Sequence, residues 1–209
     1  MRNSTTRLFF FVALLAFFAT ANSFAQVGQE FWFVAPEVTS DHGDGPILFR
    51  ITALDEDANV KIYLGKEETL IWEKTVSANS QEYYEVDVDI ENRPANIANL
   101  DNPLNKGIRI VSDQDITVYY EVVGENGSGT PANPDKFTLK GENALGTEFF
   151  VPSQDEYYNH NFTNNPARER IDIVATEDGT EIEIVPTDDV IGYTAGETIT
   201  VTLNRGETY

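Results

Sequence analysis

Aromatic side chains are the first residues of this chain that could do chemistry, as a stacking surface for sugars. The candidates are Trp32, Trp72 and the tyrosine pairs Tyr83-Tyr84, Tyr119-Tyr120 and Tyr157-Tyr158. Flat aromatic faces pack against sugar C–H groups, and phenol hydroxyls add hydrogen bonds. Neighbouring side chains of a β-strand point to opposite faces, so we expect one ring of each tyrosine pair to face outward. Trp32 and the inward tyrosines are expected in the core, with Trp72 the best exposed candidate.

Carboxylates concentrated in three turns, at residues 41–45, 55–57 and 177–179, are the second candidates. Their oxygens are the ligands that Ca²⁺ prefers, but none of these turns has the spacing of an EF-hand loop. Ordinary turn formation by Asp and Gly explains them equally well. Asp178-Gly179 in particular predicts a tight hairpin turn. We therefore predict no metal site and no cofactor, and leave Ca²⁺ open as the one ion that these turns would suit.

Groups for hydrolysis are scarce in this sequence. The chain has no Cys, which removes thiol catalysis and thiolate metal sites, and its two histidines are His42 and His160. It has no GxSxG elbow, no HExxH helix and no glycine loop with a phosphate-binding Lys. A pair of glycosidase carboxylates is not excluded by composition, since Asp and Glu together number 35, but most of them occupy outward strand positions. We predict no catalytic residues and no enzyme activity.

The first 25 residues have the layout of a Sec signal peptide. Arg2 and Arg7 precede an apolar run over residues 8–20. Ser23 and Ala25 are the small residues of a cleavage site after Ala25. The run is shorter than the roughly 20 residues that a membrane-spanning helix needs. We predict export to the outer surface or the medium, without membrane insertion after the signal is cleaved.

Period-two alternation of apolar and polar residues dominates the rest of the chain. One apolar and one polar face per strand is typical of antiparallel sheets with a solvated outer side. No stretch of a dozen residues has helical periodicity, and turn clusters rich in Gly, Pro, Asn and Asp separate the runs. The predicted class is all-β, as tandem β-sandwich-like modules. The alternating runs are residues 47–54, 60–64, 81–90, 116–122, 182–184 and 199–203, with a short strand also expected at 136–139.

Three blocks of sequence recur in the same order, which indicates an internal repeat. The matched blocks are residues 28–32 (GQEFW) with 146–150 (GTEFF), residues 51–62 with 173–184, and residues 75–84 with 200–209. The predicted organisation is a signal peptide (1–25), a first β module (26–124), a linker (125–145) and the first half of a second β module (146–209). The second module has no counterpart of residues 85–123, so we expect the gene to continue past Tyr209 into two or more further strands.

Several of these segments resemble one protein family. They are GQEFWFVAPE near the start of the exported chain, NPDKFTLKGENALGTEFFVPSQ in the middle, and IVATEDGTEIEIVP followed by AGETITVTLNRGETY. They are similar to the N-terminal domain of the IgGFc-binding protein as it occurs in large secreted Bacteroidetes proteins. The resemblance covers residues 27–209 and implies a surface or extracellular protein with further β modules. It also implies a C-terminal type IX secretion sorting domain, linked by name to gliding motility, and it supplies no catalytic or binding residues.

The formal net charge of −21 argues against two classes of partner. A strongly acidic protein repels nucleic-acid phosphates and anionic membrane surfaces. We predict a non-catalytic binding or adhesion module of a larger extracellular protein, whose partners are a glycan or glycoprotein and further domains of the same polypeptide. Two alternatives stay open: a structural spacer without a ligand, and a carbohydrate-binding accessory region of a secreted carbohydrate-active enzyme.

Overall fold

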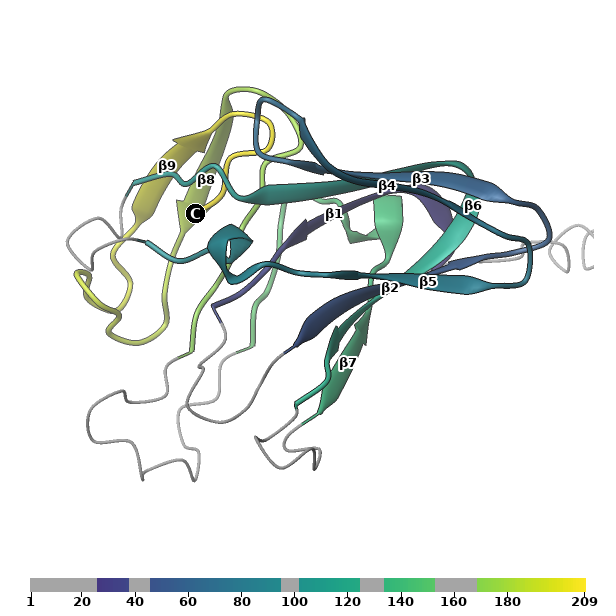
Figure 1. Cartoon of the computed structure of the whole chain (residues 1–209). Helices are drawn as coiled ribbons and strands as arrows, with labels where there is room; N and C mark the ends of the chain where they lie inside the picture. The colour runs from purple at the N-terminus through teal and green to yellow at the C-terminus, as the bar shows by residue number, and fades with distance from the viewer. Residues whose placement is uncertain (1–25, 38–45, 95–101, 125–133, 153–168) are drawn as a thin grey trace, which may run out of the picture.

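The computed structural model describes residues 26–37, 46–94, 102–124, 134–152 and 169–209 (Figure 1). The predicted signal peptide, the turn at 41–45, Tyr157, Tyr158 and both histidines lie outside these residues. The described elements are β-strands and two short 3₁₀ helices, without an α-helix, so the predicted all-β class is confirmed. Within the described part, no helix has the length and apolar character needed to cross a membrane.

One long strand organises the main sheet. It is β6 (Gly107–Val122), and four other strands pair with it in antiparallel orientation. Its first half pairs with β1 (Gly28–Val34) and β3 (Ala58–Leu64). Its second half pairs with β2 (Ile47–Ala53) and β7 (Asp135–Thr138). Since β2 and β3 pair with successive halves of β6, the sheet curls around a single core (Figure 1).

Two further strands complete this sheet, β4 (Thr69–Val76) beside β3 and β5 (Gln81–Glu85) beside β2. The acidic turn at residues 55–57 therefore connects β2 to β3, which do not pair with each other, and makes a corner of the curled sheet. Asp57 accepts a hydrogen bond from the Ala78 amide at 2.8 Å. That bond links this corner to the neighbouring one between β4 and β5, which is the turn-forming role that Asp residues usually have.

The core lies inside the curl and consists of the inward side chains of the strands. Phe33 and Phe49 meet edge to face, with ring centroids 5.5 Å apart, and Tyr120 packs against both rings. Burying each large apolar side chain contributes about 1.5–3 kcal/mol, so this cluster is the main source of stability in a chain without disulfides. The largest fully buried aliphatic residues of this core are Ile51, Val60, Ile62, Val76, Ile108, Ile110, Ile116 and Val118.

The alternating run at residues 81–90 is a strand only as far as Glu85. Residues Val88–Ile90 form a 3₁₀ helix, η2, and the carboxylate of Asp87 accepts a hydrogen bond from the Asp89 amide at 3.0 Å. Val88 is exposed as a result, although its place in the alternation predicts a core position. The prediction fails here because an Asp side chain that bonds to nearby backbone competes with the hydrogen bonds of a strand.

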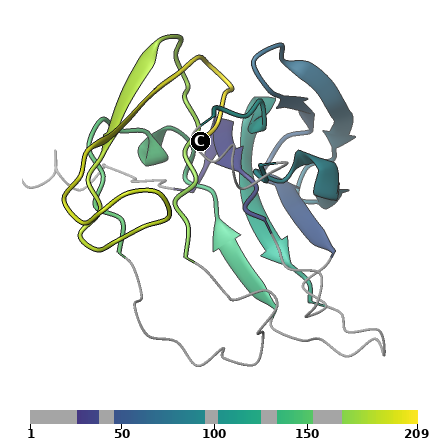
Figure 2. The same cartoon turned by 90° about the vertical axis from the view of Figure 1, so that its left-hand side faces the viewer.

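Residues 169–209 form a smaller unit beside the main sheet (Figure 2). In it β8 (Thr180–Ile184) pairs with β9 (Ile199–Leu203), and residues 173–175 hydrogen-bond with residues 207–209. Asp178-Gly179 connects the 173–175 segment to β8. A hairpin turn joins strands that pair with each other, but this segment and β8 pair with other parts of the chain, so the predicted hairpin turn at Asp178-Gly179 is wrong. It is a corner of the same kind as residues 55–57. The tandem-module organisation stays a prediction.

Candidate functional site

Strand register places two of the predicted outward tyrosines in one row on the outer face of the main sheet. Arg50 of β2 lies opposite Tyr83 of β5 on one side and opposite Tyr119 of β6 on the other. Directly opposite residues have Cβ atoms about 4.5–5.5 Å apart, so the three side chains are neighbours. Tyr83 is 57% exposed and Tyr119 is half-buried, whereas Tyr84 and Tyr120 pack on the core. The predicted alternation is confirmed for these two pairs.

Charged groups fix the surroundings of this row. Arg50 forms an ion pair with Glu121, whose other carboxylate oxygen is 3.8 Å from the Lys136 ammonium. That ammonium in turn lies 5.1 Å from the centre of the Tyr119 ring. We call these five residues, Arg50, Tyr83, Tyr119, Glu121 and Lys136, the tyrosine row. It offers aromatic faces together with hydrogen-bond donors and acceptors on rigid strands, which suits a flat polar ligand such as a sugar ring.

The other predicted aromatic positions have different surroundings. Trp72 is half-buried against the core, 6.1 Å from Tyr84 between ring centroids, so it is not the best exposed aromatic residue. Three phenylalanines are more open: Phe137 is 52% exposed, Phe149 is 65% and Phe150 is 91%. The sequence gives no local signal for this exposure, because burial of these rings depends on which segment covers them.

Trp32 lies in a polar cleft and not in the core where the sequence predicts it. Two guanidinium groups lie over the half-buried indole ring, with the carbon of Arg205 5.2 Å from the ring centre and that of Arg109 at 5.8 Å. Cation–π contacts of this kind contribute about 0.5–2 kcal/mol. The cleft has a volume of about 290 Å³, and its walls also include Glu142, Leu145, Thr176 and Glu177.

Ion pairs hold the Trp32 cleft together. Glu30 accepts hydrogen bonds from Arg109 and from the Trp32 indole, both at 2.9 Å, and Glu68 pairs with Arg109 at 2.9 Å and with Arg205 at 3.0 Å. The hydrogen bond from Arg109 lowers the pKa of Glu30. A carboxyl group with a lowered pKa stays ionised and has no proton to donate, whereas a general acid needs a raised pKa. Glu30 is therefore suited to holding the cleft in shape.

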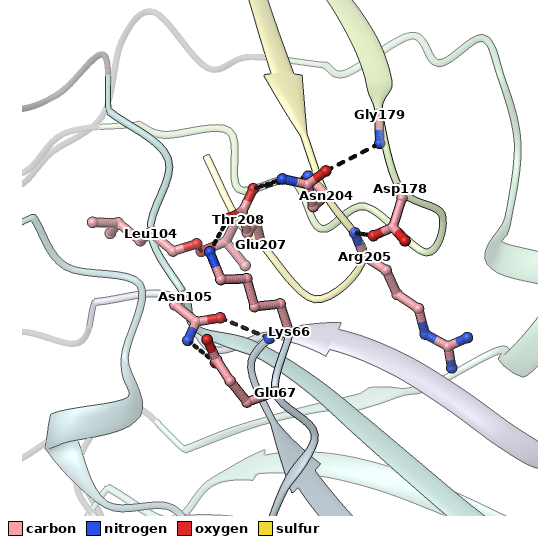
Figure 3. A network of polar contacts seen from close by, with 10 residues as sticks. All are labelled: Lys66, Glu67, Leu104, Asn105, Asp178, Gly179, Asn204, Arg205, Glu207 and Thr208. Carbon is pink, nitrogen blue, oxygen red and sulfur yellow. Dashed lines mark hydrogen bonds and ion pairs between the residues drawn. The ribbon is translucent and has the colours of Figure 1, made fainter.

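Arg205 also belongs to the joint between the small unit and the main sheet (Figure 3). Lys66 donates a hydrogen bond to Glu207 at 2.8 Å, and the Gly107 amide donates to the Gly206 carbonyl at 3.1 Å. Gly206 has φ +78°, and a Cβ there would lie 2.7 Å from the backbone of Gly65. Only glycine allows this approach, because it tolerates positive φ and has no side chain to clash.

We expect the joint to weaken in acid through Glu207. The hydrogen bond from Lys66 lowers the pKa of this carboxyl below its usual value. Because the folded-state pKa is lower than the unfolded one, the bond stabilises the fold above about pH 4.5, and this stability is lost as the pH falls further. Denaturant unfolding from about pH 6 to pH 3 should show a smaller loss for Glu207→Gln than for the unmodified chain. Glu181→Gln, at an exposed position of β8, is the control.

Metal ligands are not gathered in the described residues. No group of three or more His, Asp or Glu side chains there is arranged to hold an ion. In two of the predicted acidic turns a carboxylate binds backbone. Asp178 accepts a hydrogen bond from the Arg205 amide at 3.0 Å, and Asp57 accepts one from the Ala78 amide. The turn at residues 41–45 is outside the described part, so Ca²⁺ binding by it stays untested.

Comparison with known proteins gives one match. Residues 135–209 match the family model described as IgGFc binding protein. The matched segment runs from β7 through the small unit to the end of the chain and includes Lys136 of the tyrosine row. No curated protein and no solved structure matches the chain. The predicted resemblance is thus supported for residues 135–209, by a family whose name denotes binding.

Proposed function

We propose that this chain is a non-catalytic binding or adhesion module of a secreted or cell-surface protein, with a glycan or glycoprotein as its ligand. The observation that carries the proposal is the tyrosine row, where two aromatic rings flank an arginine on a rigid, solvated sheet face. The family match over residues 135–209 supports a binding role. The apolar N-terminal segment and the high negative charge agree with export and with a soluble extracellular protein.

The second candidate function is a structural spacer without a ligand. The observation in its favour is the joint between the small unit and the main sheet. Ion pairs and a close backbone approach tie the small unit to the main sheet, which would hold the two at a fixed distance from each other. A spacer needs no ligand. The two functions therefore differ in whether a saturable partner exists.

The chain without residues 1–25 should bind saturably to one class of target on an array of polysaccharides, mucin-type glycoproteins and immunoglobulins. Tyr83→Ala removes a 57% exposed ring, so we expect about tenfold weaker binding with little change in stability. Tyr63→Ala is the matched control, since Tyr63 lies in the other half of the sheet opposite Arg109. A folded protein that binds nothing would favour the spacer, whereas equal losses for both variants would mean that the ligand does not bind at the tyrosine row.

A further inference from the structure

The outer face of the sheet around the tyrosine row carries few carboxylates, although the chain has 35 Asp and Glu residues. Tyr83, Arg50 and Tyr119 lie side by side across three strands, and Thr138 of β7 lies opposite Tyr119. The outward residues two positions further along these strands are Gln81, Thr52 and Thr117. Arg50 carries the only charge among these seven residues.

Two carboxylates lie on the other side of the tyrosines, where Leu48 has Glu85 opposite it on one side and Glu121 on the other. Glu121 is shared by two cations, Arg50 and Lys136, so the tyrosine row carries one positive charge in excess. Counting the exposed Glu85, this face is neutral on a chain whose formal net charge is −21. The tyrosine row is therefore a local place where a negative charge is attracted.

Both cations of the tyrosine row have hydrogen-bond donors to spare. Arg50 donates to Glu121 through its Nε, and no described residue accepts a hydrogen bond from its two terminal nitrogens. The Lys136 ammonium is 3.8 Å from the Glu121 carboxylate, which is beyond the length of a hydrogen bond, and it lies against the Tyr119 ring. The planar fork of a guanidinium pairs with both oxygens of a carboxylate, and aromatic rings pack against sugar C–H groups.

We propose that the tyrosine row recognises an acidic sugar, with Arg50 and Lys136 binding the sugar carboxylate and Tyr83 packing on the sugar ring. This inference rests on the proposed glycan-binding function and names the class of sugar that the site takes. Repulsion from the net charge is screened beyond a Debye length of about 8 Å at physiological salt, so the charges within the row decide the preference. The same chemistry is offered by uronic acids of polysaccharides and by sialic acids of glycoproteins.

Two pairs of ligands, each differing in charge alone, test the proposal. The chain without residues 1–25 is titrated with polygalacturonate and with its methyl ester, which has the same backbone without the charge. A sialylated mucin and the same mucin after sialidase treatment form the second pair. We expect the carboxylated member of one pair to bind about tenfold or more tightly than its neutral counterpart, and to bind less tightly as the salt concentration rises. The pair that shows this difference identifies the source of the sugar.

Three variants localise the effect. Lys136→Gln removes an exposed cation of the tyrosine row, so it should weaken binding of the carboxylated ligand about tenfold and leave binding of the neutral one unchanged. Lys61→Gln is the matched control, because it removes the same charge from a similarly exposed position on β3, in the other half of the sheet, and should change neither. Arg50→Lys keeps the charge but not the planar fork, so it should also weaken binding of the carboxylated ligand.

Three results would overturn the proposal. Equal binding of both members of each pair, weakened by Tyr83→Ala, would remove the preference for an acidic sugar and leave the proposed binding function in place. Equal losses for Lys136→Gln and Lys61→Gln would mean that the overall charge of the chain, and not the tyrosine row, attracts the carboxylate. A folded protein that binds no glycan at all would contradict the proposed function itself, and this inference with it.

Discussion

Replacing Phe31 by alanine is expected to lower the free energy of unfolding by about 3–5 kcal/mol, the largest effect of any single change considered for this chain. Phe31 is fully buried on β1 opposite Ile110, and a Cβ added at Gly28 or at Gly141 would lie 3.6 or 3.4 Å from its ring. Truncation would leave a cavity that the surrounding strands cannot close, since β6 holds them on both sides. Urea unfolding followed by tryptophan fluorescence measures the change.

The matched control for Phe31 lies in the same motif. Phe149 occupies the aligned position of GTEFF but is 65% exposed, so Phe149→Ala should change the free energy of unfolding by less than about 0.5 kcal/mol. Similar losses for the two variants would mean that residues 146–150 are buried as β1 is.

Asn92→Ala is the second change with a large expected effect, about 2–4 kcal/mol of unfolding free energy. The Asn92 side chain is 1% exposed; it donates to Asp172 at 2.6 Å and accepts from the Thr208 hydroxyl at 2.7 Å. Burial already raises the pKa of Asp172. Without Asn92, the buried Thr208 hydroxyl keeps only the Leu104 carbonyl, at 3.3 Å, and the Asp172 carboxylate loses a donor but keeps its ion pair with Arg170 at 2.9 Å. Buried polar groups that lose a hydrogen-bond partner cost more than the bond itself contributes.

The loss from Asn92→Ala should be concentrated at the joint. Hydrogen exchange is expected to quicken at residues 173–175 and 207–209, which bond to each other, more than in β2 or β6. Asn143→Ala, at an exposed position of the 3₁₀ helix Gly141–Ala144, should leave both stability and exchange unchanged. An equal quickening across the main sheet would mean that the two units unfold as one and that the joint has no stability of its own.

These two predictions bear differently on the proposed function. Phe31 supports the curl that holds the tyrosine row, so its loss should weaken any binding through the fold. Asn92 holds the small unit, which belongs to the segment that matches the IgGFc-binding model. Binding that survives Asn92→Ala would place the ligand on the tyrosine row, whereas binding that is lost would place it near the joint.

The sequence by itself determined many of the strand residues and which side chains of those strands share a face, but it did not predict β1, β4 or the first half of β6. The alternation at residues 47–54, 60–64, 116–122, 182–184 and 199–203 was sufficient because strand periodicity is local and repeats every two residues. It also oriented Tyr83 and Tyr119 outward. It failed after Glu85, where the Asp87 carboxylate bonds to the local backbone, and alternation does not register such a competing bond.

Only the tertiary structure decided which strands meet. Asp178-Gly179 looks like a hairpin turn in sequence and residues 55–57 like an acidic turn, yet each is a corner between strands that pair elsewhere. Turn residues set a local bend and do not choose the partner of a strand. The contacts of Trp32 with Arg109 and Arg205, and the hydrogen bond from Thr208 to Asn92, join residues separated by as many as 173 positions. Such contacts depend on backbone approach at Gly206 and on the closing of the curl, and neither has a signal in the local sequence.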